Sequence, residues 1–380
     1  MNKLKVLFLI TDIGKGGAER FLIDLCSVLH KRDDVEFIIG TLYPSNEYPD
    51  LTKDFKIIDL EYNTFSLFKK TNQKQFRNLL DTFKPDIIHT HRYLAEFLSG
   101  QAVNPNIGYV CHGHDNMIQL DNLHPDSLWD KEKIFNWLEK RFLLQSKYNK
   151  VKTHFIANSS HTEAYYQKVL RNIPNICIHR IDYGFDHAKF HQLPNPCKSV
   201  DGKLRILNVG SFQNKKNQKF IIPIARELKV RNIDFEINLI GQGVNHDEVN
   251  QLVKENGLEK EVVLRGLQDK VEDWYKASDI YLHTAYYEPF GLVFLEAMAA
   301  GLPIISLNGS GNTDIIRDGW NGFLFQEEKP SLFADAIELL RNDETLAMRL
   351  ASNGNEFAKR YDMQQKADEY LTLYKSIIPR

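Results

Sequence analysis

The sequence has no apolar run that approaches the roughly 20 residues a membrane-spanning helix requires. It is also poor in cysteine, and its four cysteines show neither C-x-x-C spacing nor the pattern of a disulfide or zinc framework. Both features favour a cytoplasmic protein, attached at most to the inner face of a membrane. The formal net charge of -2 provides no overall attraction to nucleic acid, so we expect no nucleic-acid partner.

The chain instead contains short runs rich in Val, Ile and Leu, each followed by a segment with helical periodicity. This alternation is typical of βαβ units, so we predict an α/β fold with parallel sheets. A chain of 380 residues exceeds the size at which one core stops growing, so two domains are expected. The predicted strands are residues 5–11, 35–41, 86–91, 107–111, 154–158, 204–209, 235–240, 262–265, 279–284, 303–307 and 322–325.

The domain boundaries follow from a break in this alternation. Residues 183–203 contain glycine and proline but little periodicity, which is typical of a linker. We therefore expect a Rossmann-like domain over residues 1–190, a linker over 191–203 and a second Rossmann-like domain over 204–360. The last fifty residues read as helical, and the segment 361–380 could pack back on the first domain.

Residues 285–303 carry the sharpest chemical signal. A predicted strand ends near Thr284, Pro289 suits the start of a helix and Gly301 suits its end. The leading amides of such a helix would point into the crevice beyond the strand ends. A diphosphate binds favourably at that position.

Two carboxylates lie in this segment. Glu296 is surrounded by apolar residues, and burying it would cost several kcal/mol without strong donors. Glu288 lies eight residues earlier, about 12 Å away if the segment is one helix. That distance suits a ligand that carries a sugar, two phosphates and a ribose. The alternative is a dipole partner of the helix at Glu288 and a buried ion pair at Glu296.

Residues 288–303 closely resemble the E-x7-E signature of retaining GT-B glycosyltransferases, in particular the large family 4 that uses nucleotide-activated sugars. The resemblance extends over nearly the whole chain, and it implies two Rossmann-like parallel-sheet domains that face a central cleft. Weaker matching motifs lie at residues 16–20, 86–91, 112–113, 184–186 and 208–210.

The resemblance also implies a role for individual residues of the C-terminal motif. Glu288 would bind the hydroxyls of the donor sugar, and Glu296 would bind the ribose hydroxyls. The backbone amides of Phe290, Gly291 and Leu292 would hold phosphate.

The family has a Gly-Arg pair after the first strand of its second domain, followed five residues later by lysine. Lys216 matches that lysine, but Ser211 stands where arginine is usual. A missing cation removes part of the stabilisation of the charge that develops on the leaving diphosphate. Lys215 or Arg265 could supply it, and we include Arg265 and Gly266 among the donor-binding candidates.

Several candidates lie in the first half of the chain. Gly16 and Gly17 belong to a glycine loop that allows a ligand to approach the backbone, although the loop lacks P-loop spacing. The resemblance implies a role for His112 at the reacting sugar. His114 and Asp115, on the acceptor side, could form a general-base pair or only a local Asx turn.

We expect no cofactor and no metal. His89 and His91 share one face of a strand end, but no further ligand has zinc-like spacing, so a structural role is favoured. The chain also lacks D-x-D, the metal anchor of the other large glycosyltransferase fold. The charge on the leaving group would then be met by helix amides and Lys216.

Residues 131–152 form a basic amphipathic pattern, with seven Lys or Arg interleaved with aromatic and aliphatic residues. A second patch, residues 65–70, also pairs aromatics with lysine. These segments would suit contact with an anionic membrane. The alternative is a core helix with a solvated basic face.

Taken together, the sequence predicts a retaining glycosyltransferase that moves a hexose-type sugar from a nucleotide diphosphate sugar, a UDP-sugar by our prediction. The acceptor would be a saccharide or a lipid-linked sugar, in the synthesis of a cell-surface polysaccharide. Two alternatives stay open: a non-catalytic subunit that binds nucleotide sugar, suggested by Ser211, and a sugar-nucleotide epimerase on the same fold.

Overall fold

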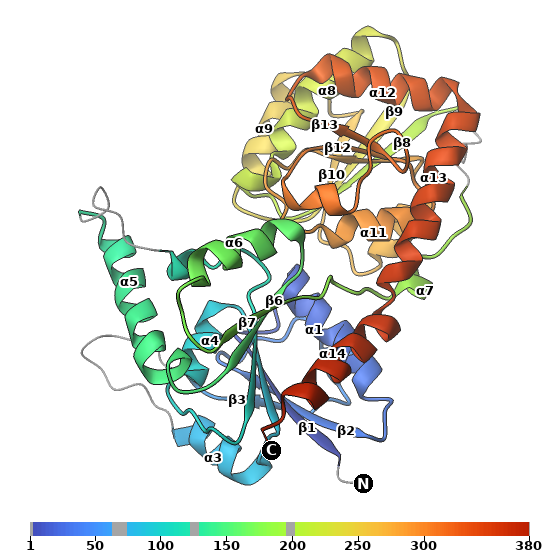
Figure 1. Ribbon diagram of the computed structural model, residues 1–380. Coiled ribbons are helices and arrows are strands. Elements are labelled where there is room, and N and C mark those ends of the chain that lie inside the picture. Colours follow the sequence, from blue (N-terminus) through green and yellow to red (C-terminus); the bar gives the residue numbers. More distant parts are fainter. Residues whose placement is uncertain (1–2, 63–73, 122–128, 195–201, 380) are drawn as a thin grey trace. The chain divides into compact units, whose positions relative to one another are not determined.

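The computed structural model describes residues 3–62, 74–121, 129–194 and 202–379 (Figure 1). The chain forms two compact units: the first domain, Met1–Gly184 with Met363–Arg380, and the second domain, Phe185–Asp362. The second domain thus begins before the boundary at residue 190 that the sequence suggests. The reason is that the Phe185 amide donates a hydrogen bond to the Tyr361 carbonyl, and Phe185 forms a β-bridge with Asp362, at the other end of the same domain. Of the predicted linker, residues 195–201 lie outside the described residues.

The first domain is built on a parallel sheet with the strand order β3-β2-β1-β4-β5-β6-β7. Its central strands are buried on both faces, and β1 is an almost continuous apolar run for that reason. The order reverses between β1 and β4, and a crevice for ligands forms at such a point. The strands are β1 Leu4–Ile10, β2 Val35–Thr41, β3 Ile57–Asp59, β4 Ile87–His91, β5 Gly108–His112, β6 Thr153–Ala157 and β7 Ile176–Arg180.

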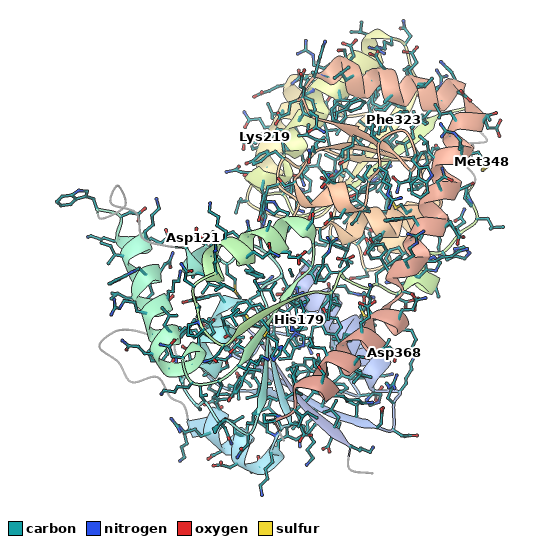
Figure 2. The ribbon with its side chains drawn as sticks, viewed as in Figure 1. Asp121, His179, Lys219, Phe323, Met348 and Asp368 are labelled. Atoms are coloured by element: carbon teal, nitrogen blue, oxygen red, sulfur yellow. The ribbon has the colours of Figure 1, made fainter. Side chains whose placement is uncertain are left out.

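Helix α14 returns to the first domain at the end of the chain and packs on α1 and β5 (Figure 1). Asp368, labelled on α14 in Figure 2, accepts a hydrogen bond of 2.7 Å from Arg32. Tyr370 and Tyr374 of the same helix are fully buried. The helices of this domain are α1 Gly17–Leu29, α2 Pro49–Thr52, α3 Lys74–Phe83, α4 Tyr93–Ser99, α5 Lys131–Leu143, α6 Ser160–Leu170 and α14 Met363–Ile377.

The second domain repeats this design with the strand order β10-β9-β8-β11-β12-β13, again all parallel. Its order reverses between β8 and β11, which makes their carboxyl ends the expected ligand site. The strands are β8 Leu204–Val209, β9 Phe235–Ile240, β10 Val262–Gly266, β11 Ile280–His283, β12 Ile304–Leu307 and β13 Phe323–Phe325.

The helices of the second domain enclose a separate apolar core between themselves and this sheet. Within the described ranges of the chain, no helix is both long enough and apolar enough to cross a bilayer. The helices are α7 His187–Phe190, α8 Ile221–Val230, α9 His246–Glu255, α10 Val271–Lys276, α11 Leu292–Ala299, α12 Pro330–Asn342 and α13 Glu344–Ala358.

All eleven predicted strands are present, each with bounds within one residue of the prediction. The prediction of two Rossmann-like domains with parallel sheets is therefore confirmed. Strands β3 and β7 were not predicted.

Candidate functional site

A cluster of charged and polar side chains lies where the strand order of the second domain reverses. Lys216 follows β8, His283 is the last residue of the neighbouring strand β11, and Glu288 lies in the loop after β11. Strands β8 and β11 are neighbours in the sheet, so their carboxyl ends bring together residues that are up to 72 positions apart. This is the position in an open α/β sheet where ligands bind.

Glu288 is the centre of this cluster. Its side chain is buried, and its Oε2 forms an ion pair with Lys216 Nζ and lies 3.1 Å from His283 Nε2. Both partners bind the same oxygen. Among the described residues none bonds Oε1, which leaves that oxygen able to accept a hydrogen bond from a ligand hydroxyl.

The cluster keeps Glu288 ionised. Burial acts to raise the pKa of this carboxyl group, but the charge of Lys216 and the hydrogen bond of His283 outweigh it and lower the pKa to about 2. Burial also lowers the pKa of His283 despite the opposing effect of Glu288, so the ring is neutral. A neutral ring donates from Nε2 to Glu288 and offers Nδ1 to the Tyr281 hydroxyl, 3.2 Å away.

The loop after β12 fixes the backbone of Glu288. The amide of Glu288 donates to the Gly309 carbonyl (2.7 Å), and the Gly311 amide donates to the Glu288 carbonyl (3.1 Å). A Cβ on Gly311 would lie 1.9 Å from the Pro289 carbonyl oxygen, so only glycine fits here. Buried Asn312 braces this loop by accepting from the Gly309 amide. The sequence analysis missed this support, although the glycines on either side of Ser310 were a signal for it.

Helix α11 begins later than predicted. The start expected at Pro289 is wrong, because Gly291 adopts a left-handed conformation (φ 93°) and the helix runs from Leu292. A Cβ on Gly291 would lie 2.4 Å from the Phe294 ring, which explains glycine at this position. Glu288 therefore lies outside the helix, and its predicted spacing along a helix axis does not apply.

The start of α11 still offers an anion site. Gly291 is its N-cap, and within the described part of the chain no side chain caps this end. The amides at the start of a helix have no partner inside the helix and carry a partial positive charge. Phe290, Gly291 and Leu292, the predicted phosphate-binding residues, are the residues at this end.

Glu296 lies one turn further along α11 and is only partly buried, so it avoids the full cost of burying a carboxylate. The reason is that Leu292, Val293 and Glu296 share the one face of this helix that is incompletely covered. Glu296 Oε2 accepts a hydrogen bond from the hydroxyl of buried Tyr275 (2.9 Å), on the neighbouring helix α10. This bond orients the carboxylate.

Lys216 ends the short 3-10 helix Asn214–Lys216, and α8 begins only at Ile221. A second 3-10 helix, Gln218–Phe220, joins the two. Lys215 lies over the Tyr287 ring, with 5.5 Å between its Nζ and the ring centroid. Ser211 carries no charge. In the described part of the chain, Lys216 is the lysine of this loop that forms an ion pair with Glu288.

Arg265 is held within its own sheet. Its Nε donates to Asn238 (2.7 Å), its Nη2 donates to Glu236 (3.1 Å), and the guanidinium lies over the Trp274 ring. It would have to break these contacts to replace the missing arginine of the family pattern. Gly266, beside it, ends β10 with a left-handed φ of 66°.

In the first domain, the histidine candidates gather at the carboxyl ends of β4 and β5. His112 is fully buried, and its Nδ1 lies 3.4 Å from the Tyr370 hydroxyl of α14. Burial lowers the pKa of His89, His91 and His112, so these rings are neutral. The role of His112 at the reacting sugar stays a prediction.

His114 follows β5 in a left-handed conformation (φ 66°). Its Nε2 lies 2.7 Å from His91 Nδ1, and its Nδ1 is hydrogen-bonded to the Tyr183 hydroxyl. Both ring nitrogens of His114 therefore have hydrogen-bond partners, and neither partner is Asp115. The Asp115 carboxylate accepts from the next amide along the chain, which favours the local turn over a general-base pair.

The glycine loop of the first domain leads into α1, with Gly16 as N-cap. A Cβ on Gly16 would lie 2.2 Å from Glu19 Oε2, whereas one on Gly17 would meet nothing within 4 Å. Glu19 is buried and forms an ion pair of 2.9 Å with Arg92, just after β4. The sequence analysis missed this pair, although Glu19 belongs to the motif at residues 16–20.

The basic pattern at residues 131–152 is divided between surface and core. Lys140 and Lys147 are buried, and Lys140 donates to the Leu120 carbonyl while Lys147 pairs with buried Glu96. The remaining five basic residues are exposed. The second predicted patch, residues 65–70, lies outside the described residues.

Two family models match the chain. The model described as Glycosyltransferase Family 4 matches residues 15–189, and the model described as Glycosyl transferases group 1 matches residues 192–357. The two matches correspond to the two halves of the chain.

Full-length relatives agree with these matches. The chain is 24% identical over 375 residues to N-acetyl-alpha-D-glucosaminyl L-malate synthase of Bacillus anthracis, covering 97% of this chain and 93% of that protein. The fold of this chain is similar to that of Anabaena Alr3699/HepE, solved in complex with UDP and glucose (TM-score 0.77, 20% identity), over 98% of this chain and 100% of that chain. The fold is also similar to that of WaaG, a glycosyltransferase involved in lipopolysaccharide biosynthesis (TM-score 0.73, 17% identity), over 99% of this chain and 100% of that chain.

Proposed function

Because the chain belongs to the GT-B glycosyltransferases of the family 4 type, we propose that it transfers a hexose-type sugar from a UDP-sugar. The acceptor in this proposal is a saccharide or a lipid-linked sugar, and the product belongs to a cell-surface polysaccharide. Two relatives support this choice: Alr3699/HepE was solved with UDP and glucose, and WaaG is involved in lipopolysaccharide biosynthesis.

The observation that carries the proposal is the contact of Lys216 and His283 with one oxygen of Glu288, beside the uncapped start of α11. Glu288 Oε1 would accept a hydroxyl of the donor sugar. Lys216 and the first amides of α11 would bind the diphosphate, and Glu296 would bind the ribose. The site thus provides acceptors for hydroxyls and donors for phosphate.

In the proposed reaction, the bond between the anomeric carbon and the phosphate oxygen breaks, and negative charge grows on the diphosphate. Lys216 and the α11 amides stabilise that charge, so we propose that transfer needs no metal ion. The acceptor hydroxyl attacks from the face that the diphosphate leaves. Its proton passes to the departing phosphate oxygen, and the anomeric configuration is retained.

A second candidate function is a non-catalytic subunit that binds nucleotide sugar. It is favoured by Ser211 in place of arginine, together with the contacts that hold Arg265 on Glu236 and Asn238. Such a subunit would bind a UDP-sugar without turnover.

The test is a transfer assay over a panel of UDP-sugars, with and without saccharide acceptors, combined with a thermal-shift screen. We expect turnover only with acceptor, and a kcat lower by about 10²–10³ in Lys216→Ala. Lys215→Ala is the matched control and should keep its activity. Binding that raises the melting temperature without any transfer would support the non-catalytic subunit instead.

The same proposal includes a location in the cytoplasm, at the membrane surface. Exposed Lys131 and Lys133 of α5, beside partly buried Trp137, support contact with anionic lipid. In sedimentation with anionic vesicles at low salt, the double variant Lys131→Glu/Lys133→Glu should bind less than the wild type. The matched control changes the exposed Lys254 and Lys260 of the second domain to Glu, and equal binding of all three proteins would refute the contact.

A further inference from the structure

His283, the last residue of β11, has a buried ring that links two groups of the second domain. Its Nε2 lies 3.1 Å from Glu288 Oε2, and its Nδ1 lies 3.2 Å from the Tyr281 hydroxyl. That hydroxyl in turn donates to the carbonyl of Val209 (3.2 Å), the last residue of the neighbouring strand β8. The ring therefore connects the Glu288 carboxylate to the backbone of the sheet.

This row of hydrogen bonds has room for one more proton. A neutral His283 that donates from Nε2 has only a lone pair at Nδ1, so the single hydroxyl proton of Tyr281 faces two acceptors, that nitrogen and the Val209 carbonyl. A protonated ring donates from both nitrogens, to Glu288 and to the oxygen of Tyr281. The Tyr281 proton then belongs to Val209 alone. The geometry thus accommodates an imidazolium with each of its donors satisfied.

The charge on this ring depends on two neighbours. Within the described part of the chain, the charged groups that act on His283 are Glu288 and Lys216. Burial and the charge of Lys216 lower the pKa of His283, whereas the hydrogen bond and the charge of Glu288 raise it. The other elements around the ring present uncharged groups: Ser306 lies opposite it on β12, and the Phe294 ring of α11 lies 4.7 Å away between centroids.

Binding of the donor changes this balance, in an argument that rests on the proposed function. Lys216 there binds the diphosphate, so its ammonium group no longer serves Glu288 alone. A buried carboxylate is strongly destabilised when it loses its cation, unless another cation replaces it. His283 already contacts the same carboxylate oxygen as Lys216 and is the group placed to do so.

We propose that His283 is a positioning residue of the donor site: it takes up one proton from solvent when Lys216 binds the diphosphate, and it then holds Glu288 as an imidazolium. Glu288 stays ionised, and its Oε1 stays available to a hydroxyl of the sugar. Donor binding is in this way coupled to proton uptake. Because the coupling is reciprocal, donor affinity falls as pH rises.

The test is isothermal titration calorimetry of the full-length chain in two buffers that differ in their enthalpy of ionisation, from about pH 6 to about pH 8. The probe is whichever of UDP-glucose, UDP-galactose and UDP-N-acetylglucosamine gives the largest thermal shift, since none of the three has a group that titrates in this range. We expect an uptake that approaches one proton per bound donor. The dissociation constant should rise by up to about 10-fold per pH unit.

The two possible failures are distinguishable in the wild type. Binding without proton uptake across this range would overturn the role of His283 and leave the proposed function standing. Absence of binding by all three UDP-sugars would overturn the proposed function, and the role of His283 with it.

Variants of two histidines identify the group that takes the proton. His283→Gln keeps an amide that can donate to Glu288 but cannot be protonated in this range. It should bind the donor without proton uptake, with an affinity that does not change with pH. The matched control is His246→Gln, which changes the histidine beside Asp247 on α9 and should keep the uptake. Unchanged uptake in His283→Gln, or its loss in His246→Gln, would overturn the proposal.

A change at Tyr281 keeps the test decisive even if His283→Gln does not fold. Tyr281→Phe retains His283 but removes the oxygen that accepts from its Nδ1, so proton uptake should shift to lower pH by about one unit. The matched control is Tyr361→Phe, which changes a buried tyrosine of the same domain that packs against Phe357. Identical pH profiles of uptake in both variants would contradict the proposal.

Discussion

At the scale of single residues, Glu288 makes the stability of the second domain depend on pH. Its pKa of about 2 lies below the ordinary value of 4.5, because Lys216 and His283 together outweigh the effect of burial. A group with a lowered pKa stabilises the fold fully above its unfolded pKa and loses that contribution as pH falls through its folded pKa. The loss should therefore develop below about pH 4.5.

We accordingly expect the free energy of unfolding of the wild type to fall more steeply from about pH 5 to about pH 3 than that of Glu288→Gln. Urea denaturation at several pH values measures this difference. Glu259→Gln, which changes an exposed carboxylate in the same domain, should follow the wild type. Parallel pH profiles for all three proteins would contradict the assignment of the stabilising ion pair.

A buried ion pair between Lys147 and Glu96 lies in the first domain, and its contribution to stability can be tested. Both side chains are fully buried, and Lys147 Nζ lies 2.8 Å from each carboxylate oxygen of Glu96. Lys147→Met leaves that carboxylate buried without its cation, so we expect a loss of about 3–5 kcal/mol in the free energy of unfolding. Adding Glu96→Gln should recover part of the loss. Exposed Lys150→Met is the control, and urea titration is the measurement.

These residue pairs also show what the sequence could not predict. The resemblance to a known family pointed to Lys216 and Glu288 separately, but no spacing in the sequence shows that two residues 72 positions apart form an ion pair. The partial exposure of Glu296 could not be predicted, because an apolar neighbourhood in sequence does not show which face of a helix its domain covers.

At the scale of elements, the start of α11 depends on one glycine. Gly291→Ala imposes a left-handed φ on alanine, at about 1–2 kcal/mol, and also drives its Cβ against the Phe294 ring. Gly257→Ala is a matched control, since Gly257 has a φ of 60° but open space around its Cβ. We expect Gly291→Ala to lower the free energy of unfolding more than Gly257→Ala and to raise KM for the donor. Equal losses would show that Phe294 does not hold the start of the helix.

The elements that the sequence analysis missed share a physical cause. Strand β3 has only three residues, and β7 (Ile176–Arg180) is a partly buried edge strand that ends in a histidine and an arginine. Edge strands have one neighbour and one open side, so they need not form a continuous apolar run, although the edge strands β10 and β13 of the second sheet were predicted. Central strands such as β8 and β9 were predicted with their bounds.

At the scale of the whole molecule, each domain reverses its strand order once, between β1 and β4 and between β8 and β11. The histidines of β4 and β5 lie beside the first reversal of strand order. The Lys216 and Glu288 pair lies at the second, after β8 and β11. The alternation of strands and helices was enough to predict two domains. This alternation does not show that the chain returns to the first domain at Met363, because the return depends on contacts between residues hundreds of positions apart.

This return makes a final prediction about the intact chain. Helix α14 provides the buried Tyr370 and Tyr374, and its Asp368 binds Arg32 at 2.7 Å. A chain that ends at Asp362 loses these contacts, so its first domain should unfold at a lower temperature while the second domain is unaffected. A chain that ends at Ile377 keeps the whole helix and is the control.

Hydrogen exchange followed by mass spectrometry distinguishes the two domains in these truncated chains. Amides of β4 and β5, which lie beside α14 and its tyrosines, should lose protection in the chain that ends at Asp362. Amides of β8 and β11 should keep theirs, because the second domain has its own core. Equal loss of protection in both domains would mean that α14 stabilises the molecule as one unit, and unchanged protection would mean that the first domain folds without it.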